Sequence, residues 1–177
     1  MDIIVIVEHL RNQCLSPKNV TFRGESMPFK LRCVLESHGA QEAVVSRLST
    51  SLPRDLAEFW RVCESARLFE DTSFGQWGLE ILGPSESLLL TEVYKQTRSH
   101  DFVKGDLIIG KFIGDSELLL IRCDLEAADF GSLLIVAPLD LRSDWIIVAI
   151  SFREFLTRYV AAQGDKYWEL SDCPPRP

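Results

Sequence analysis

The sequence predicts an α+β protein with a mainly antiparallel sheet flanked by helices. Apolar residues at helical spacing dominate the first half of the chain. The second half carries three adjacent apolar runs of strand length between residues 106 and 138, separated by short turns. A last amphipathic segment begins at Ser151. Because helices and strands are grouped rather than alternating along the chain, an antiparallel sheet is expected.

The N-terminal segment, residues 3–14, is predicted to be a helix. Its β-branched start also suits a strand, but four apolar residues fall at helical spacing, namely Ile3, Val7, Leu10 and Cys14. Residues 15–30 (LSPKNVTFRGESMPFK) carry turn-forming residues throughout and few periodic apolar positions. We therefore expect an irregular connection there.

Two further helices are expected before residue 64. The first follows Gly39 and has apolar residues at helical spacing, namely Ala40, Ala43, Val44 and Leu48. The second begins at Pro53, whose missing N–H needs no partner in the first helical turn. Its apolar stripe consists of Leu52, Leu56, Phe59, Trp60 and Cys63.

Residues 74–84 (FGQWGLEILGP) predict a strand or a strand pair, because a short aromatic run is broken by glycines and ends at Gly83-Pro84. Ser85 is expected to cap the helix that follows. The residues of this helix that we expect to face inward are Leu89, Val93 and Tyr94.

The apolar runs at residues 106–114, 117–124 and 131–138 predict neighbouring strands of a meander, and residues 145–150 (WIIVAI) are a fourth strand or an extended lead-in. The closing helix has the clearest signal. Ser151 and Glu154 form a capping box, Gly164 stands where a C-terminal cap is expected, and residues 164–177 are expected as an extended tail. The apolar face of this helix consists of Phe152, Phe155, Leu156, Tyr159 and Val160.

Length and charge limit the function classes. A chain of 177 residues fits a single domain, residues 1–177, that folds without disulfide bonds. Its formal net charge of −7 disfavours direct nucleic-acid binding, because like charge repels phosphate, and favours a protein partner with a basic surface. No signal peptide and no run of about 18 apolar residues is present, so we expect a cytoplasmic protein without a membrane partner.

Residues that carry chemistry are sparse. The five cysteines are odd in number and none forms a C-x-x-C pair, which disfavours a disulfide framework and a zinc ribbon, and we expect reduced thiols, several of them buried. His9, His38 and His100 stand among polar or turn residues and are expected at the surface. We therefore predict no catalytic residues, no cofactor and no metal site, and thus no enzyme.

Residues 105–112 (GDLIIGKF) resemble a phosphate-binding loop, which reads Gly, any four residues, Gly, Lys and then Ser or Thr. Leu107, Ile108 and Ile109 favour an extended backbone, Asp106 repels phosphate, and Phe112 cannot bind Mg²⁺. We interpret the segment as a strand, in which Gly110 marks a bulge or a close packing contact and Lys111 points outward.

Three motifs, taken in order between residues 40 and 163, resemble the SUKH superfamily. The first is a helix with the pattern Leu-Pro, apolar, Phe-apolar, matched by Leu52, Pro53, Leu56, Phe59 and Trp60. The second is a strand–turn–strand matched by Ile109, Gly110, Gly114, Leu118, Leu119, Leu120, Ile121 and Asp124. The third is a closing helix matched by Ser151, Phe152, Phe155 and Leu156.

The resemblance implies a SUKH-like α+β fold without a shared set of catalytic residues. It also implies a protein-binding role, since bacterial relatives look like immunity proteins that block a cognate toxin and fungal relatives regulate cell-wall synthesis through protein contacts. Our leading hypothesis is an immunity protein that occludes a basic toxin domain. The alternatives are a regulatory or scaffold protein without a toxin, and a small ligand-binding protein or enzyme.

The expected docking face is acidic. Its candidate residues are Glu70, Asp71, Asp115, Glu117, Asp124, Glu126 and Asp129. Trp77 is a candidate aromatic anchor, with core packing as its alternative role. The motif residues Leu52, Phe59, Trp60, Phe152, Phe155 and Tyr159 are assigned to the core.

Overall fold

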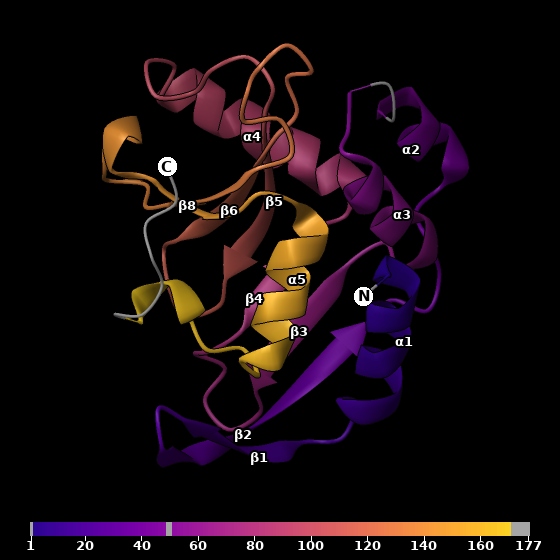
Figure 1. The fold of residues 1–177 in the computed structure, drawn as a ribbon, viewed down its shortest axis with the longest axis vertical. Helices are drawn as coiled ribbons and strands as arrows, with labels where there is room; N and C mark the ends of the chain where they lie inside the picture. Colours follow the sequence, from indigo (N-terminus) through magenta and orange to yellow (C-terminus); the bar gives the residue numbers. More distant parts are fainter. Residues whose placement is uncertain (1, 49–50, 171–177) are drawn as a thin grey trace.

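An eight-stranded antiparallel sheet forms the centre of the molecule, and its strands are arranged in the order of the chain (Figure 1). This computed structural model describes residues 2–48 and 51–170. The sheet confirms the predicted α+β class and the meander of the second half. Its strands are β1 (Lys18–Phe22), β2 (Glu25–Leu35), β3 (Ala66–Asp71), β4 (Leu79–Ile81), β5 (Asp106–Phe112), β6 (Leu118–Arg122), β7 (Leu133–Val136) and β8 (Ile146–Ala149).

Helices cover both faces of this sheet. α1, α3 and α5 pack against one another on one face, whereas α4 lies against β5 (Figure 1). Successive strand residues point to opposite faces. The helices are α1 (Ile3–Gln13), α2 (Glu42–Leu48), α3 (Arg54–Val62), α4 (Pro84–Thr97) and α5 (Phe152–Ala161), with short 3-10 helices η1 (Arg142–Asp144) and η2 (Tyr167–Glu169).

The strand β6 shows how the two faces form separate cores. Leu119 and Ile121 belong to the large core beneath α1, α3 and α5. Leu118 and Leu120 belong to a smaller core that Tyr94 of α4 helps to close. A strand buried on both sides reads as a continuous apolar run, which is why this part of the sheet could be predicted from the sequence.

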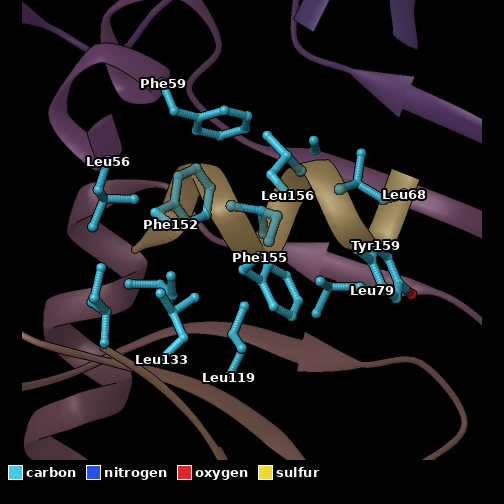
Figure 2. Close-up of a cluster of buried hydrophobic side chains, with 14 of the residues drawn as sticks. Leu56, Phe59, Leu68, Leu79, Leu119, Leu133, Phe152, Phe155, Leu156 and Tyr159 are labelled. Carbon is cyan, nitrogen blue, oxygen red and sulfur yellow. The ribbon is translucent and has the colours of Figure 1, made fainter. Parts of the chain in front are cut away.

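The motif residues assigned to the core are all buried, which confirms that assignment. Figure 2 shows Phe152, Phe155 and Tyr159 projecting from α5 among leucines of the neighbouring strands. Phe59 of α3 meets Phe152 edge to face, with 5.3 Å between the ring centroids. The wide aromatic face of α5 therefore joins the helical layer to the sheet.

The expected irregular connection over residues 15–30 is wrong, because this segment forms β1 and most of β2. Arg23 and Gly24 both have positive φ (52° and 86°) and join the paired residues Phe22 and Glu25 in a two-residue hairpin. Pro28 is accommodated because the pairing of β1 with β2 is irregular between Asn19 and Thr21. The turn-forming residues in this segment thus serve one hairpin and one bulge.

Helix α4 begins one residue after Gly83, its N-cap, so Ser85 does not cap it. The prediction that Leu89 and Val93 face inward is also wrong, since they are 69% and 48% exposed. The buried face carries Ser87 and Thr91 instead. Small polar side chains let the helix approach β5 closely, which apolar periodicity does not reveal.

Thr91 links α4 to the sheet through its hydroxyl group. The Thr91 hydroxyl accepts the N–H of Ile108 at 2.8 Å and donates to the carbonyl of Ser87 at 2.6 Å. Ile108 lies beside the β-bulge that separates it from Gly110 in the pairing of β5 with β6. We expect Thr91→Val to lower the free energy of unfolding by about 1–3 kcal/mol, because the buried N–H of Ile108 loses its acceptor.

Urea denaturation followed by circular dichroism measures this loss. The matched control is Thr97→Val on the same helix, where the exposed hydroxyl only donates to carbonyls of its own helix, Val93 among them. We expect the control to change the free energy of unfolding by less than about 0.5 kcal/mol. Equal effects of the two substitutions contradict the assigned role of Thr91.

The closing helix begins as predicted. The Ser151 side chain accepts the N–H of Glu154 at 3.1 Å, and the Glu154 carboxylate accepts the N–H of Ile150 at 3.0 Å. At the other end Gln163 takes the left-handed conformation (φ 53°), and the N–H of Gly164 bonds to the Tyr159 carbonyl at 3.0 Å. The cap is therefore a Schellman motif in which Gln163 takes the position after the C-cap and Gly164, also at positive φ (89°), follows it.

An extended tail from residue 164 is wrong for residues 167–169, which form η2. Tyr167 is buried, and its hydroxyl donates to the Val148 carbonyl at 3.0 Å. Trp168 meets the Phe112 ring edge to face at 5.6 Å. The expectation for residues 171–177 falls outside the described residues.

Candidate functional site

The segment that resembles a phosphate loop is a strand. Residues 106–112 form β5, and the pairing shift between Ile108 and Gly110 confirms the predicted bulge. A Cβ atom on Gly110 would lie 2.9 Å from the Glu80 carbonyl oxygen, so close packing also requires this glycine. Lys111 is half-exposed and its ammonium lies 3.0 Å from the Glu80 carboxylate. The expected outward-pointing strand charge is confirmed.

The eight candidate docking residues fall into two groups at opposite ends of β6 rather than on one continuous face. One group surrounds the β3–β4 and β5–β6 turns, whose backbones meet where Gly114 approaches Gln76. The other group follows β6. The first group is Glu70, Asp71, Trp77, Asp115 and Glu117, and the second is Asp124, Glu126 and Asp129.

Carboxylates of the first group have partners within the chain. Lys166 lies 2.7 Å from Asp115 and 2.6 Å from Glu117, and its hydrogen bond lowers the pKa of the Asp115 carboxyl. Glu70 is nearly buried and binds Arg32 at 2.6 Å. Asp71 is buried and accepts N–H groups of the turn that follows it. These side chains therefore stabilise the region of the two turns through bonds within the chain, and they also carry negative charge.

Trp77 is half-buried and packs along β1 and β2. Its ring stacks on Phe22 at 5.2 Å and lies 6.3 Å from the Phe29 ring. Its indole N–H donates to the Gly164 carbonyl at 3.1 Å. These contacts correspond to the core-packing role that the sequence left open beside the anchor role.

The second group gathers around two basic residues. Lys104 lies 3.3 Å from Asp124 and 3.0 Å from Glu126. A hydrogen bond from the backbone N–H of Glu126, followed by Lys104, lowers the pKa of the Asp124 carboxyl. Asp129 binds Arg122 at 2.9 Å. The second group keeps an excess of negative charge, because Lys104 lies between two carboxylates and compensates only one of them.

A buried ionic cluster lies beside this second group, and sequence reasoning missed it. Asp106 is fully buried and accepts hydrogen bonds from Arg122 at 2.5 Å and from Arg142 at 2.6 Å. Its carboxylate also accepts the N–H of Val103 at 2.9 Å. The signal in the sequence was Arg122, a charged residue at the end of a fully apolar strand. With its hydrogen-bonding capacity used within the chain, the cluster fixes β5, β6 and η1 to one another.

A groove of about 440 Å³ lies between α2, α4 and the end of β6 that carries this second group. Its polar members Lys104, Asp124 and Glu126 are paired with one another, so they do not converge on the space inside. Its apolar lining includes Leu48, Leu52, Leu88, Leu107 and Leu125. A further lining carboxylate, Asp106, is held by Arg122 and Arg142, so the charged side chains among the described lining residues are not aimed at the space as a site for a small substrate requires.

The outer edge of β8 exposes a run of apolar side chains between residues 139 and 150. β8 is the last strand of the sheet, and Ile146 and Ile147 are 53% and 43% exposed. Consecutive strand residues point to opposite faces, so neither face of the sheet is covered at this point. The other exposed members of this apolar edge are Leu139, Leu141 and Ile150.

The opposite edge of the sheet has a different character. The exposed residues of β1 are Lys18, Asn19 and Thr21, and its pairing with β2 is irregular. Charge and bulges on an edge strand hinder pairing with other chains. The pairing of β8 with β7 is irregular as well, so the two edges differ in their exposed side chains, which are polar on β1 and apolar at the apolar edge.

The remaining candidates for chemistry are few. His9, His38 and His100 are exposed, as expected, and Cys33, Cys63 and Cys123 are buried. Among residues 2–48 and 51–170, no three His, Cys, Asp or Glu side chains are grouped to hold a metal ion. No helix in the described part of the chain has both the length and the apolar character needed to cross a membrane.

Comparison of the chain with protein-family models and with curated proteins finds no match. The resemblance to the SUKH superfamily therefore stays a prediction.

Proposed function

We propose that this protein is a non-enzymatic protein-binding module, of the immunity type, that neutralises a cognate toxin by occlusion. The observation that carries the proposal is the apolar edge, residues 139–150 with β8 at its centre. Exposed apolar patches of this kind mark surfaces that bind other proteins. The resemblance of the core motifs to SUKH proteins, many of which bind proteins, supports the same class.

The proposed mode of binding is the addition of a strand to the sheet. The outer edge of β8 presents backbone groups that an extended segment of the partner can pair with, while Ile146 and Ile147 supply apolar contacts on either side. The C-terminal part of β8 is occupied, because the Val148 carbonyl accepts hydrogen bonds from Tyr167 and from Arg158 at 3.3 Å. We therefore place the docking site on Ile146, Ile147 and the preceding residues.

The acidic residues have a different role in this proposal. Their partners within the chain leave them less able to form new ion pairs, but the net charge of −7 remains. Long-range attraction speeds the encounter with a basic toxin domain, whereas contacts at the apolar edge hold the complex. Because charge acts on the encounter and apolar contacts act on the bound complex, added salt is expected to lower mainly the association rate.

For a toxin domain found encoded beside this gene, we expect Ile147→Lys to weaken binding by at least about 30-fold, because a charge replaces a central apolar contact. Surface plasmon resonance at several salt concentrations measures both rates. The matched control is Leu89→Lys on α4, at an apolar site that is more exposed than Ile147 (69% against 43%) and lies on another element. The control is expected to bind as the unaltered protein does.

Two results contradict the proposal in different ways. Binding that survives Ile147→Lys shows that the docking surface lies elsewhere. No binding of a neighbouring toxin even at low salt removes the immunity role and favours the regulatory alternative, for which the apolar edge would bind another protein.

A further inference from the structure

Cys14 and Cys33 meet in space although 18 residues separate them in the sequence. Cys14 is the C-cap of α1, and Cys33 lies in β2. The N–H of Cys33 donates to the Cys14 carbonyl at 2.6 Å, and each thiol shifts the pKa of the other. This short backbone hydrogen bond brings the two residues to the separation that a disulfide bond requires.

The surroundings of Cys33 are unusual for a structural cysteine. Cys33 lies at the shift in pairing between Arg32 and Val34, and its sulfur accepts the N–H of Phe69 at 3.3 Å. Phe69 has a φ of 53°, a conformation that costs energy in a residue with a bulky side chain. Residues with strained backbone conformations of this kind are concentrated at functional sites in proteins.

A cavity of about 210 Å³ reaches Cys14 from the surface. Cys14 lines this cavity and is partly exposed, whereas Cys33 is fully buried behind it. The cavity is also lined by His9, Lys18, Asn19 and Phe69. A small polar molecule can therefore reach the sulfur of Cys14 but not that of Cys33.

The two thiols differ in acidity. The hydrogen bond from Cys33, together with the charge of Lys18, lowers the pKa of the Cys14 thiol to about 7, while burial acts in the opposite direction. The same hydrogen bond, together with burial, raises the pKa of Cys33. Since the thiolate is the reactive form, Cys14 is the nucleophile of the pair and Cys33 remains a protonated thiol beside it.

We propose that Cys14 and Cys33 form a peroxide-sensitive thiol pair, a modification site that is independent of the apolar edge. In the first step the Cys14 thiolate attacks one oxygen of hydrogen peroxide, forming Cys14 sulfenic acid and releasing hydroxide. In the second step the sulfur of Cys33 attacks the sulfenic sulfur, and a disulfide bond forms with loss of water. The two thiols are oxidised by two electrons and one peroxide is reduced to water.

The chain offers matched controls in Cys63 and Cys123. Both are buried, and burial raises their thiol pKa, to about 11 for Cys63 and about 12 for Cys123. The Cys63 thiol donates to the Ser65 carbonyl at 3.1 Å rather than to another thiol. These two cysteines are expected to resist peroxide.

The test treats the reduced, full-length protein with hydrogen peroxide and maps the products by peptide mass spectrometry. We expect a peptide that joins Cys14 to Cys33, lighter by two hydrogen atoms, and its loss on reduction with dithiothreitol. Cys14 should be oxidised at least about tenfold faster than Cys63 or Cys123. A Cys173→Ser variant removes the tail thiol and should give the same product.

Cys33→Ser is expected to accumulate sulfenic acid on Cys14, detected by addition of dimedone, because the second thiol is missing. Circular dichroism checks that this variant folds, and Cys33→Ala repeats the test without a hydroxyl group. The proposal is overturned if Cys14 reacts no faster than Cys63, or if peroxide links Cys14 to a cysteine other than Cys33. Neither readout depends on binding of a partner protein.

Discussion

Asp106→Asn is expected to lower the free energy of unfolding by about 3–5 kcal/mol, because it removes the buried carboxylate that the guanidinium groups of Arg122 and Arg142 share. Asp106 is fully buried, and Arg122 beside it is only 6% exposed. Arg142 is bound through two of its nitrogens, at 2.6 Å and 3.2 Å. The neutral amide leaves the buried Arg122 with Asp129 as its remaining carboxylate partner and removes the partner of the partly exposed Arg142.

The matched control for Asp106→Asn is Asp129→Asn. Asp129 binds the same Arg122, at 2.9 Å, but its side chain is 39% exposed. Exposed ion pairs contribute little, so the control is expected to cost less than about 1 kcal/mol. Urea denaturation followed by tryptophan fluorescence compares the two variants, and losses of the same size mean that burial of the cluster does not govern its contribution.

Phe155→Ala is the second substitution for which we expect a large effect, a loss of about 3–5 kcal/mol in the free energy of unfolding. Phe155 is fully buried at the centre of the large core (Figure 2). Its ring stacks on Tyr159 at 5.5 Å and lies 6.1 Å from the Trp168 ring. The substitution removes the apolar surface that joins α5 to the sheet and to η2.

Leu89→Ala provides the comparison, because the apolar spacing of α4 predicts that Leu89 is buried, whereas the structure places it 69% exposed. We expect a change below about 0.5 kcal/mol for this variant. Thermal unfolding followed by circular dichroism measures both variants. A large loss for Leu89→Ala would restore the orientation of α4 that its apolar spacing predicts.

The part of the fold that could be predicted is the part in which local sequence and tertiary burial agree. The runs that became β5, β6 and β7 are buried on both faces over most of their length, so each contains an unbroken apolar stretch, at residues 107–109, 118–121 and 133–136. The capping residue Ser151 acts within one helical turn. In these places the sequence alone specifies the local structure.

The hairpin of β1 and β2 and the strand β3 could not be predicted in the same way. Half of the β1 hairpin is exposed, and β3 buries two acids, Glu70 and Asp71, so neither shows a simple apolar pattern. Arg32 and the turn after β3 satisfy those acids from outside the strand. Whether these segments form strands depends on contacts with residues that are distant in the chain.

The candidate site could likewise be predicted only in part from the sequence. The sequence identified the acidic residues, but their distribution to two ends of β6 depends on the path of the sheet. The apolar edge was visible only as a fourth strand, because an exposed edge and a buried strand read alike in sequence. The contact of Cys14 with Cys33 depends on how α1 lies over β2.

By itself the sequence determined the class of the fold, the meander and the residues of the aromatic core, because apolar periodicity and helix caps are local properties. The tertiary structure alone decided which strand lies at the open edge, which charges are compensated inside the chain, and which two of the five cysteines meet. These are relations between segments far apart in the chain, and only the packing of the helices on the sheet establishes them.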